Sequence, residues 1–189
     1  MISISFTDGN KVKLRKIRFS DVSDIIENLS DKGVAKWIPQ IPFPYRRKHA
    51  INYIKKTHYQ LKNKKAVALG IELKESKRLI GTIGLKDIDW KNKSAVLGYL
   101  LGRKYWGKGL MAEAIKLMLA FGFKKLKLHR VSAKVYEPNK RSQRVLEKCW
   151  FKKEGIRRHA LYKFRKWHNE ILYAILASEF KVFSPSKRF

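Results

Sequence analysis

The spacing of apolar and polar residues changes several times along this chain, and each spacing predicts a different element. Alternation over residues 12–17 is typical of a half-buried strand. Apolar residues then recur at helical spacing, which predicts one helix that begins after an N-cap at Ser20 and a second helix over residues 48–61. Three prolines between these helices predict a loop over residues 34–45, because proline lacks an N–H donor and restricts the residue before it.

The middle and the end of the chain alternate between apolar strands and amphipathic helices. Three apolar segments separated by short polar turns predict a meander of strands at residues 66–73, 78–88 and 95–101. The pattern then predicts a helix over 109–126, a strand over 130–136, a short helix over 139–148, and strands over 151–159 and 170–177. This order of seven strands and four helices predicts a single α/β domain, residues 1–189, with a mostly antiparallel sheet.

Charge narrows the set of partners that this domain can attract. Lys and Arg number 44 against 15 Asp and Glu, a formal net charge of +29, and the excess runs through the whole sequence. Such a field attracts anions, such as nucleic acid, an acidic protein, a phosphate-bearing cofactor or an anionic membrane, and it disfavours a small polycationic substrate unless a local acidic pocket offsets it. A lysine-rich surface that only keeps the protein dissolved remains an alternative explanation.

Cysteine, histidine and hydropathy patterns exclude several further classes of protein. Cys149 is the single cysteine, which excludes an intrachain disulfide, and we expect it to be a small core residue. The five histidines show no metal-ligand spacing, so no structural metal is expected. No apolar run reaches the ~20 residues of a membrane span, and the N-terminus lacks a signal-peptide core. These patterns predict a cytoplasmic protein, monomeric or homodimeric, that does not bind a membrane.

The segment 99–114 carries the strongest sign of chemistry. A strand leads into a turn that contains Gly107 and Gly109, and this turn opens a helix. Glycine lets the backbone approach a bulky anion closely and adopt positive φ, and the helix N-terminus offers unpaired N–H groups. The segment therefore predicts a phosphate cradle, with an ordinary strand-to-helix turn as the alternative. It is neither a G-x-G-x-x-G fingerprint nor a P-loop.

Three motifs in this order resemble the GNAT acyl-CoA N-acyltransferases, in particular the RimJ/RimL-type branch that acetylates protein N-termini. They are Leu97-Gly98-Tyr99, then Trp106-Gly107-Lys108-Gly109 with Glu113-Ala114, and finally Pro138-Asn139-x-x-Ser142 with Val145-Leu146-Glu147-Lys148. The resemblance covers about residues 12–177. It implies the GNAT fold, a mixed, mostly antiparallel sheet of about seven strands flanked by four helices. It also implies an acetyl-CoA-dependent N-acetyltransferase that releases CoA.

The resemblance also implies which residues bind acetyl-CoA. The backbone of the glycine turn is expected to hold the pyrophosphate, the edge of the preceding strand to pair with the pantetheine amides, and Asn139 to bond the pantetheine arm near Ser142. Asn139 is equally well placed to be a helix N-cap after Pro138. The turn residues are Trp106, Gly107, Lys108, Gly109, Leu110 and Met111, and the edge residues are Tyr99, Leu100 and Leu101. Met111 stands where the family has a small residue.

The usual catalytic side chains of the family are absent at their aligned positions. Val96 stands where a Glu often acts as base, and Leu146 stands where a Tyr often acts as acid. Within the RimJ/RimL branch, Ser142 is then the candidate acid for the departing thiolate. Glu137 is the candidate base.

The scarcity of carboxylates at this site also bears on the acceptor. Asp87 and Asp89 are further candidates for the base. An α-amino group with a pKa near 7.7–8.0 is partly neutral without a base, whereas a lysine near 10.4 costs ~4–5 kcal/mol to deprotonate at neutral pH. A site poor in bases therefore fits a protein N-terminus better than a lysine.

Two other segments depart from the family pattern or bear on the acceptor. Cys149-Trp150-Phe151 replaces the family's Gly-Phe, so Trp150 must adopt a backbone that favours glycine, or the turn must be rebuilt. In the family, the loop that contains Trp37, Pro39, Ile41 and Phe43 helps to wall the acceptor pocket. Trp37 and Phe43 are therefore candidate substrate-binding residues, with loop-anchoring core contact as the alternative.

Three functions remain open from the sequence. The first is a protein N-terminal acetyltransferase that acts on a ribosomal protein and uses its basic surface to associate with the ribosome or with RNA. The second is a small-molecule amine or antibiotic acetyltransferase, although polycationic substrates favour acidic pockets. The third is a non-catalytic acyl-CoA- or RNA-binding protein on the same fold.

Overall fold

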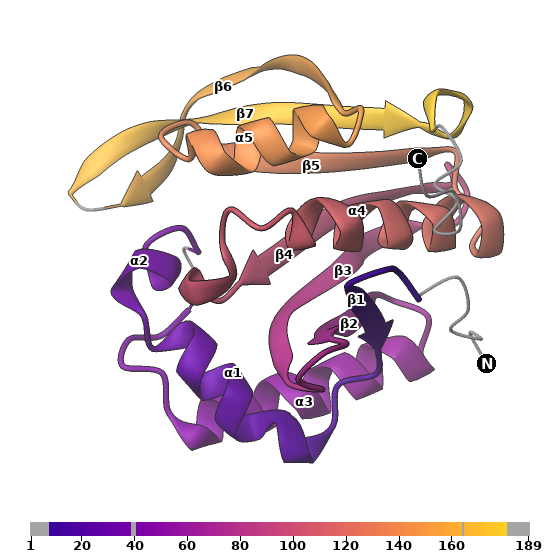
Figure 1. The fold of residues 1–189 in the computed structure, drawn as a ribbon. Helices are drawn as coiled ribbons and strands as arrows, with labels where there is room; N and C mark the ends of the chain where they lie inside the picture. Colours follow the sequence, from indigo (N-terminus) through magenta and orange to yellow (C-terminus); the bar gives the residue numbers. More distant parts are fainter. Residues whose placement is uncertain (1–7, 39–40, 164, 181–189) are drawn as a thin grey trace.

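The computed structural model describes residues 8–38, 41–163 and 165–180, and it contains a seven-stranded sheet (Figure 1). The strand order is β1-β2-β3-β4-β5-β7-β6, and among the described residues one neighbouring pair, β4–β5, is parallel. The predicted mixed, mostly antiparallel sheet is therefore confirmed. The strands are β1 (Val12–Arg15), β2 (Val67–Leu73), β3 (Leu79–Asp89), β4 (Ser94–Leu101), β5 (Arg130–Tyr136), β6 (Lys152–Lys163) and β7 (Lys166–Leu176).

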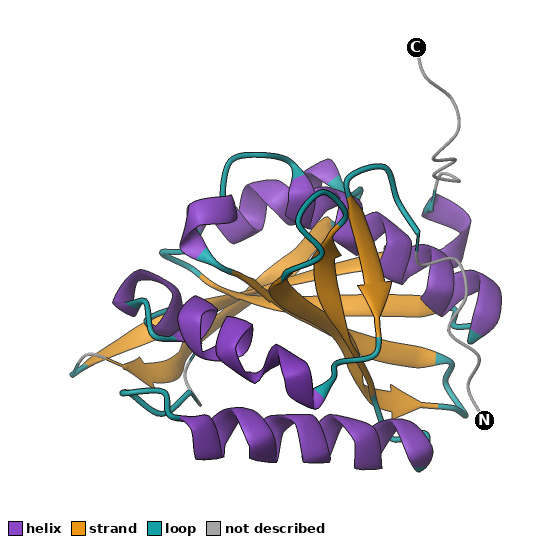
Figure 2. Ribbon diagram, turned by 60° about the horizontal axis from the view of Figure 1, so that its bottom comes forward, coloured by secondary structure: helices purple, strands orange, loops and turns teal. Residues whose placement is uncertain are grey.

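The described ranges contain five α-helices rather than four. They are α1 (Val22–Leu29), α2 (Lys32–Ala35), α3 (Arg47–Lys62), α4 (Leu110–Ala120) and α5 (Lys140–Lys148). The additional helix, α2, is a single turn that lies where a loop was predicted, and the Asp31 side chain caps it by accepting from the Gly33 N–H at 2.6 Å. Figure 2 shows that helices cover both faces of the sheet.

Several predicted boundaries were wrong. Ser20 does not cap α1, because it lies inside a 3-10 turn, Phe19–Asp21, that precedes the helix. The predicted helix 109–126 is α-helical through Ala120 and continues as a π-helical turn, Phe121–Lys125. The first strand ends at Arg15, and the final hairpin is longer than predicted. Cross-strand pairing carries β6 to Lys163 and starts β7 at Lys166, although these residues are polar.

The core lies on both faces of the sheet. On one face, α4 and α5 pack on the sheet, and Ala114, Ile115 and Met118 of α4 are completely buried. On the other face, α1 and α3 form a smaller cluster around Ile25 and Ile54. Cys149 belongs to the first cluster, as predicted, and burial raises the pKa of its thiol to about 12.

The turn after α5 forms as expected, although Trp150 stands where the family has glycine. Trp150 has φ +65°, in the left-handed region that favours glycine. The turn is closed by the Phe151 N–H, which donates to the Leu146 carbonyl at 3.1 Å. The Trp150 ring packs against Phe180 with ring centroids 6.0 Å apart, and the Lys116 ammonium lies 4.7 Å from its centre. These contacts offset the strained backbone.

The sheet divides between β4 and β5. Their parallel pairing runs from Ser94–Arg130 to Leu97–Ala133 and then stops between described residues, while β4 continues to Leu101 and β5 to Tyr136. Beyond Leu97, β4 is paired only on its β3 side. The β5-facing edge of residues 98–101 is therefore left to other partners, and this opening positions the candidate site.

Candidate active site

The glycine turn before α4 has the geometry that the sequence predicted. Gly107 has φ +79° and Gly109 has φ +76°, so both adopt the positive φ that glycine allows. A Cβ built on either glycine would meet no atom within 4 Å, which leaves the space over this backbone open. Gly109 is the N-cap of α4 and has no side chain to bond the N–H groups of the first turn. These donors and the helix dipole therefore remain available to an anion.

Trp106 ties this turn to β4 and to α5. Its Nε1 donates to the Leu101 carbonyl at 2.8 Å, and the Arg141 guanidinium lies 4.5 Å from the centre of the indole ring. Arg141 thus brings a positive charge next to the glycine turn. Sequence reasoning missed this role, because only the tertiary fold brings positions 35 residues apart into a cation–π contact.

Ser142 and Tyr99 form a hydroxyl pair at the opening between β4 and β5. The Tyr99 hydroxyl and Ser142 Oγ are 2.6 Å apart, and either can donate. Burial raises the pKa of Tyr99, so its hydroxyl stays protonated. Sequence reasoning expected only backbone contacts from Tyr99 and missed its side chain, because the pair joins β4 to α5. Tyr99 is therefore a neutral hydrogen-bond partner that fixes the position of the Ser142 hydroxyl.

Asn139 holds Ser142 in place. Its Oδ1 accepts a hydrogen bond from the Ser142 N–H at 3.2 Å, so Asn139 is the N-cap of α5, one of its two predicted roles. The cap engages the amide oxygen of Asn139. Its NH₂ group is the part that remains for the predicted contact with pantetheine.

Of the candidate bases, Glu137 lies at this end of the sheet. It follows β5, and its backbone is held on two sides, since its N–H donates to the Asn169 carbonyl at 3.0 Å and its carbonyl accepts from Gln143 Nε2 at 2.6 Å. The half-buried Glu137 side chain is therefore carried on a fixed backbone near α5.

Asp87 and Asp89 lie at the other end of the sheet. Asp89 pairs with Ser94 at the start of β4, about 20 Å along the strand from Leu100. Its carboxylate accepts from the Asn92 N–H at 2.8 Å and stabilises the β3–β4 turn. The structure does not bring these two carboxylates to the candidate site.

The predicted acceptor loop contributes one buried contact and one exposed ring. Trp37 packs edge-on against Tyr136 at the end of β5, with ring centroids 5.8 Å apart. Phe43 is 51% exposed, and the Lys32 ammonium lies 5.7 Å from its ring centre. Pro39 lies outside the described residues. Trp37 is thus positioned beside the opening.

Tyr136 is a residue that sequence reasoning treated only as the end of a strand. Its ring lies between Trp37 and His168 of β7, and the His168 ring centroid is 4.7 Å away. The side chain is on the face of β5 opposite Val135, which packs in the α4 cluster. Its buried hydroxyl has no hydrogen-bond partner among the described residues, and burial raises its pKa. Unpaired buried hydroxyls are rare in folded proteins and call for an explanation.

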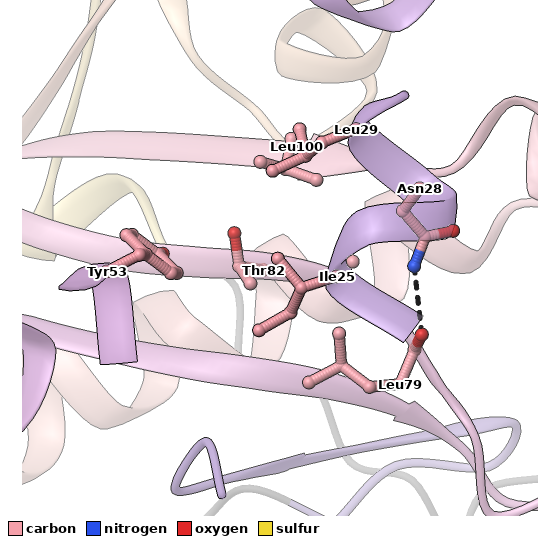
Figure 3. A pocket seen from close by; sticks show the side chains of 8 residues that line it. Ile25, Asn28, Leu29, Tyr53, Leu79, Thr82 and Leu100 are labelled. Carbon is pink, nitrogen blue, oxygen red and sulfur yellow. Dashed lines mark hydrogen bonds between the residues drawn. The ribbon is translucent and has the colours of Figure 1, made fainter. Parts of the chain in front are cut away.

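A cavity between α1, α3, β3 and β4 is too small for a substrate (Figure 3). It measures about 10 Å³, which is room for one water molecule at most. Asn28 lies beside it and donates from Nδ2 to the Leu79 carbonyl at 2.9 Å. The lining residues are Ile25, Asn28, Leu29, Tyr53, Leu79, Gly81, Thr82 and Leu100.

Within the described ranges, neither a metal-ligand cluster nor a membrane-spanning helix accompanies the site. No three His, Cys, Asp or Glu side chains gather there in a way that could hold a metal ion. No helix within these ranges is long and apolar enough to cross a membrane.

Comparisons with known proteins agree with this architecture. The acetyltransferase (GNAT) domain family matches residues 11–152. The N-acetyltransferase p20 of Bacillus licheniformis, itself uncharacterized, is 34% identical over 148 residues, which are 78% of this chain and 83% of that protein. The ribosomal protein uS5-alanine N-acetyltransferase of Escherichia coli is 31% identical over 102 residues, 53% of each chain.

A solved structure extends the similarity to the whole fold. The ribosomal-protein-S5-alanine acetyltransferase from Vibrio fischeri superposes with a TM-score of 0.82 and 25% identity, and the match covers 92% of this chain and 97% of that one. Members of the matched family transfer acetyl groups from acetyl-CoA to amines, and the open glycine turn and the exposed edge of β4 fit that ligand. By fold and by sequence, this chain belongs to the GNAT family of acetyl-CoA-dependent N-acetyltransferases.

Proposed function

We propose that this N-acetyltransferase acts on a protein N-terminal α-amino group, as the RimJ/RimL-type branch does. The observation that carries the proposal is the composition of the opening between β4 and β5. It presents the hydroxyl pair Tyr99–Ser142, and Glu137 is the one candidate carboxylate that lies at this end. An α-amine is about a tenth to a sixth neutral at pH 7 without help, whereas a lysine requires a strong base.

Each residue of the site has a distinct task in this proposal. Acetyl-CoA supplies an activated acetyl thioester. The backbone from Trp106 to Met111 binds its phosphates, supported by the charge of Arg141. Ser142 Oγ, held by Asn139 and hydrogen-bonded to the Tyr99 hydroxyl, would donate its proton to the departing CoA thiolate and would take a proton back from solvent before the next turnover.

The acceptor side is assigned to Trp37 and Tyr136. We place the acceptor against the Trp37 ring, on the face of β5 that carries Tyr136. The hydroxyl of Tyr136 is covered in the free protein, so it gains a hydrogen bond to the acceptor backbone as the Trp37 ring shifts to admit the acceptor; this bond explains why a buried polar group lies there. Glu137 takes up the proton that the amine loses, directly or through water. Phe43 contributes at the rim of this site.

Two measurements test the proposal in order. Calorimetric titration with acetyl-CoA, at low and at moderate salt, should give saturable binding that survives the higher salt. Binding that vanishes with salt would instead favour the non-catalytic alternative.

The second measurement compares two peptides of the same sequence. One has a free N-terminus and no lysine, and the other is blocked at its N-terminus and carries one lysine. Acetylation of the first alone supports the proposal. Acetylation of the lysine peptide, or of small amines only, contradicts it.

A further inference from the structure

The tip of the β6–β7 hairpin exposes two large aromatic rings. Tyr162 is 63% exposed and Trp167 is 59% exposed, and they are direct cross-strand partners. Their ring centroids are 5.0 Å apart, with the planes tilted by 56°. Together they form a continuous aromatic platform on one face of the hairpin. Other exposed aromatic residues, such as Tyr59 and Trp90, have no such ring contact among the described residues.

Cationic residues flank this platform along the hairpin. Arg158, Arg165 and Lys166 are exposed, and none of them pairs with an acidic side chain within the described ranges. The nearby Arg157, by contrast, binds Glu170 at 2.9 Å. The hairpin tip therefore combines aromatic surface with cations that no acidic side chain of the described residues neutralises.

A groove adjoins the platform on the same face. A β-bulge between Arg157 and Leu161 opens a space of about 530 Å³ lined by Arg158, His159 and Asn169. Asn169 and Trp167 are two residues apart on β7, so they share one face of the strand. A charged group held there would lie beside an aromatic group stacked on the platform.

We propose that the β6–β7 hairpin tip binds single-stranded RNA, with unpaired bases stacked on Tyr162 and Trp167 and phosphates held by Arg158, Arg165 and Lys166. Stacking on aromatic side chains beside a basic groove is the general way in which proteins hold unpaired nucleotides. The bases of a duplex are already stacked on one another, so this surface favours single strands.

Other partners fit these observations less well. A second copy of the chain would bring the same cations face to face, each copy with a net charge of +29. Insertion into a membrane is opposed by Arg165 and Lys166, which lie at the hairpin turn itself. An acidic peptide would satisfy the cations but would leave the two aromatic rings in water.

The position of the hairpin connects this inference to catalysis. Tyr136, the last residue of β5, pairs with Glu170, and Trp167 lies about 10 Å farther along β7. The platform is thus at the end of the sheet where β4 and β5 separate. The choice of RNA as the nucleic acid rests on the proposed function, because a ribosomal acceptor would present its N-terminus beside RNA.

The test measures fluorescence anisotropy of a labelled 12-nucleotide uridine strand as salt is varied. The variant Tyr162→Ser/Trp167→Ser should bind at least tenfold more weakly, with an unchanged slope of log affinity against log salt. The variant Arg165→Gln/Lys166→Gln should lose affinity with a slope reduced by about 1.4, the value expected for two phosphate contacts on a single strand. It alters no buried contact, so it remains informative if the aromatic variant disturbs the hairpin.

The matched control is Tyr59→Ser/Trp90→Ser, which removes the same two residue types from other exposed positions. It should bind RNA like the unaltered protein. Equal loss in this control, loss of less than twofold in the hairpin aromatic variant, or equal affinity for duplex RNA would each overturn the inference. Displacement of the strand by polyglutamate of equal charge at the same concentration would also overturn it, in favour of an acidic protein partner.

The two proposals can fail separately. Oligonucleotide binding requires neither acetyl-CoA nor an acceptor peptide. Both hairpin variants should acetylate the free N-terminal peptide at the rate of the unaltered protein. RNA binding without any peptide acetylation would overturn the proposed acceptor and leave the stacking platform standing.

Discussion

Tyr136→Phe tests whether the buried hydroxyl at the end of β5 is kept for a ligand. The substitution removes one oxygen and leaves the ring between Trp37 and His168 in place. Tyr136 is 9% exposed, and its hydroxyl has no hydrogen-bond partner in the described part of the chain. In the free protein, that hydroxyl therefore loses its hydration without gaining a hydrogen bond, which lowers the stability of the folded state.

The magnitude follows from the cost of an unpaired hydroxyl. Burying such a group costs about 1–3 kcal/mol, so removing the oxygen should stabilise the folded protein. The small gap that the oxygen leaves offsets part of this stabilisation. We expect the free energy of unfolding to rise by about 1 kcal/mol, which raises Tm by about 2–4 °C for a protein of this size. A hydrogen bond to the acceptor is worth about 0.5–1.5 kcal/mol, so KM for the peptide should rise by about two- to tenfold.

Tyr173→Phe is the matched control. Tyr173 is also buried on a strand, at 2% exposure, but its hydroxyl donates to Glu147 Oε1 at 2.9 Å. Removing this charge-assisted bond should lower stability by about 1.5–3 kcal/mol. Each variant removes one hydroxyl oxygen from the unaltered protein, but the two changes should shift Tm in opposite directions.

Thermal unfolding without ligand and steady-state acetylation of a free N-terminal peptide measure both effects. A lower Tm for Tyr136→Phe would mean that the hydroxyl has a partner in the free protein, and the reasoning would be refuted. A higher Tm with an unchanged peptide KM would refute only the contact with the acceptor.

Four other predictions follow from the site and the core. Gly109→Trp should abolish CoA binding in calorimetry, because the indole would fill the space over the turn. Gly109→Ala requires the same positive φ, but its Cβ meets no atom within 4 Å, so this variant should still bind CoA. Equal loss of binding in both variants would point to backbone strain instead. Ser142→Ala should lower kcat about a hundredfold with little change in KM for acetyl-CoA, and equal changes in both would make Ser142 a binding residue. Burial alone would raise the pKa of Asp21, but hydrogen bonds from Arg15 and from the Arg18 N–H outweigh it and hold the pKa below 3.8; the stability that this carboxylate adds is therefore present above about pH 4 and lost as pH falls through the lower folded pKa. Urea unfolding between about pH 2 and pH 7 should accordingly show a shallower acid loss for Asp21→Asn, and an identical pH dependence would contradict this assignment. Cys149, whose buried thiol has a pKa of about 12, should resist iodoacetamide at about pH 8 until the protein is unfolded, as peptide mass measurement would show, and rapid alkylation of the folded protein would contradict its place in the core.

The fold could be predicted wherever local pattern and tertiary environment agree. The three strands of the meander alternate or stay apolar, because their residues meet the core, and their positions were predicted within two residues. The helix α2 has a single turn and no periodicity to detect, since an Asp31 cap and packing of Val34 define it. The start of β7 was missed for a similar reason, because Lys166, Trp167 and His168 are held by pairing with β6 and not by an apolar face.

The candidate site also combines features that the local sequence indicates with features that depend on the tertiary fold. Glycine permits positive φ, so the sequence indicated that Gly107 and Gly109 could adopt it, and both do in the turn before α4. The Tyr99–Ser142 pair does not follow in this way, because it depends on how α5 lies across β4. The rings around Tyr136 come from three separate segments of the chain, so no local spacing reveals them.

The junction between β4 and β5 also determines how this molecule can deform. Four residue pairs join these strands, against seven between β5 and β7, and the four are in the parallel geometry that is slightly less stable per residue. The sheet thus consists of two stiff sections, β1–β4 and β5–β7–β6, that meet at their thinnest connection. Rotation of one section against the other changes the width of the opening between β4 and β5. A ligand that bonds both strands adds hydrogen bonds at the junction between the two sections, so its binding also couples their movements.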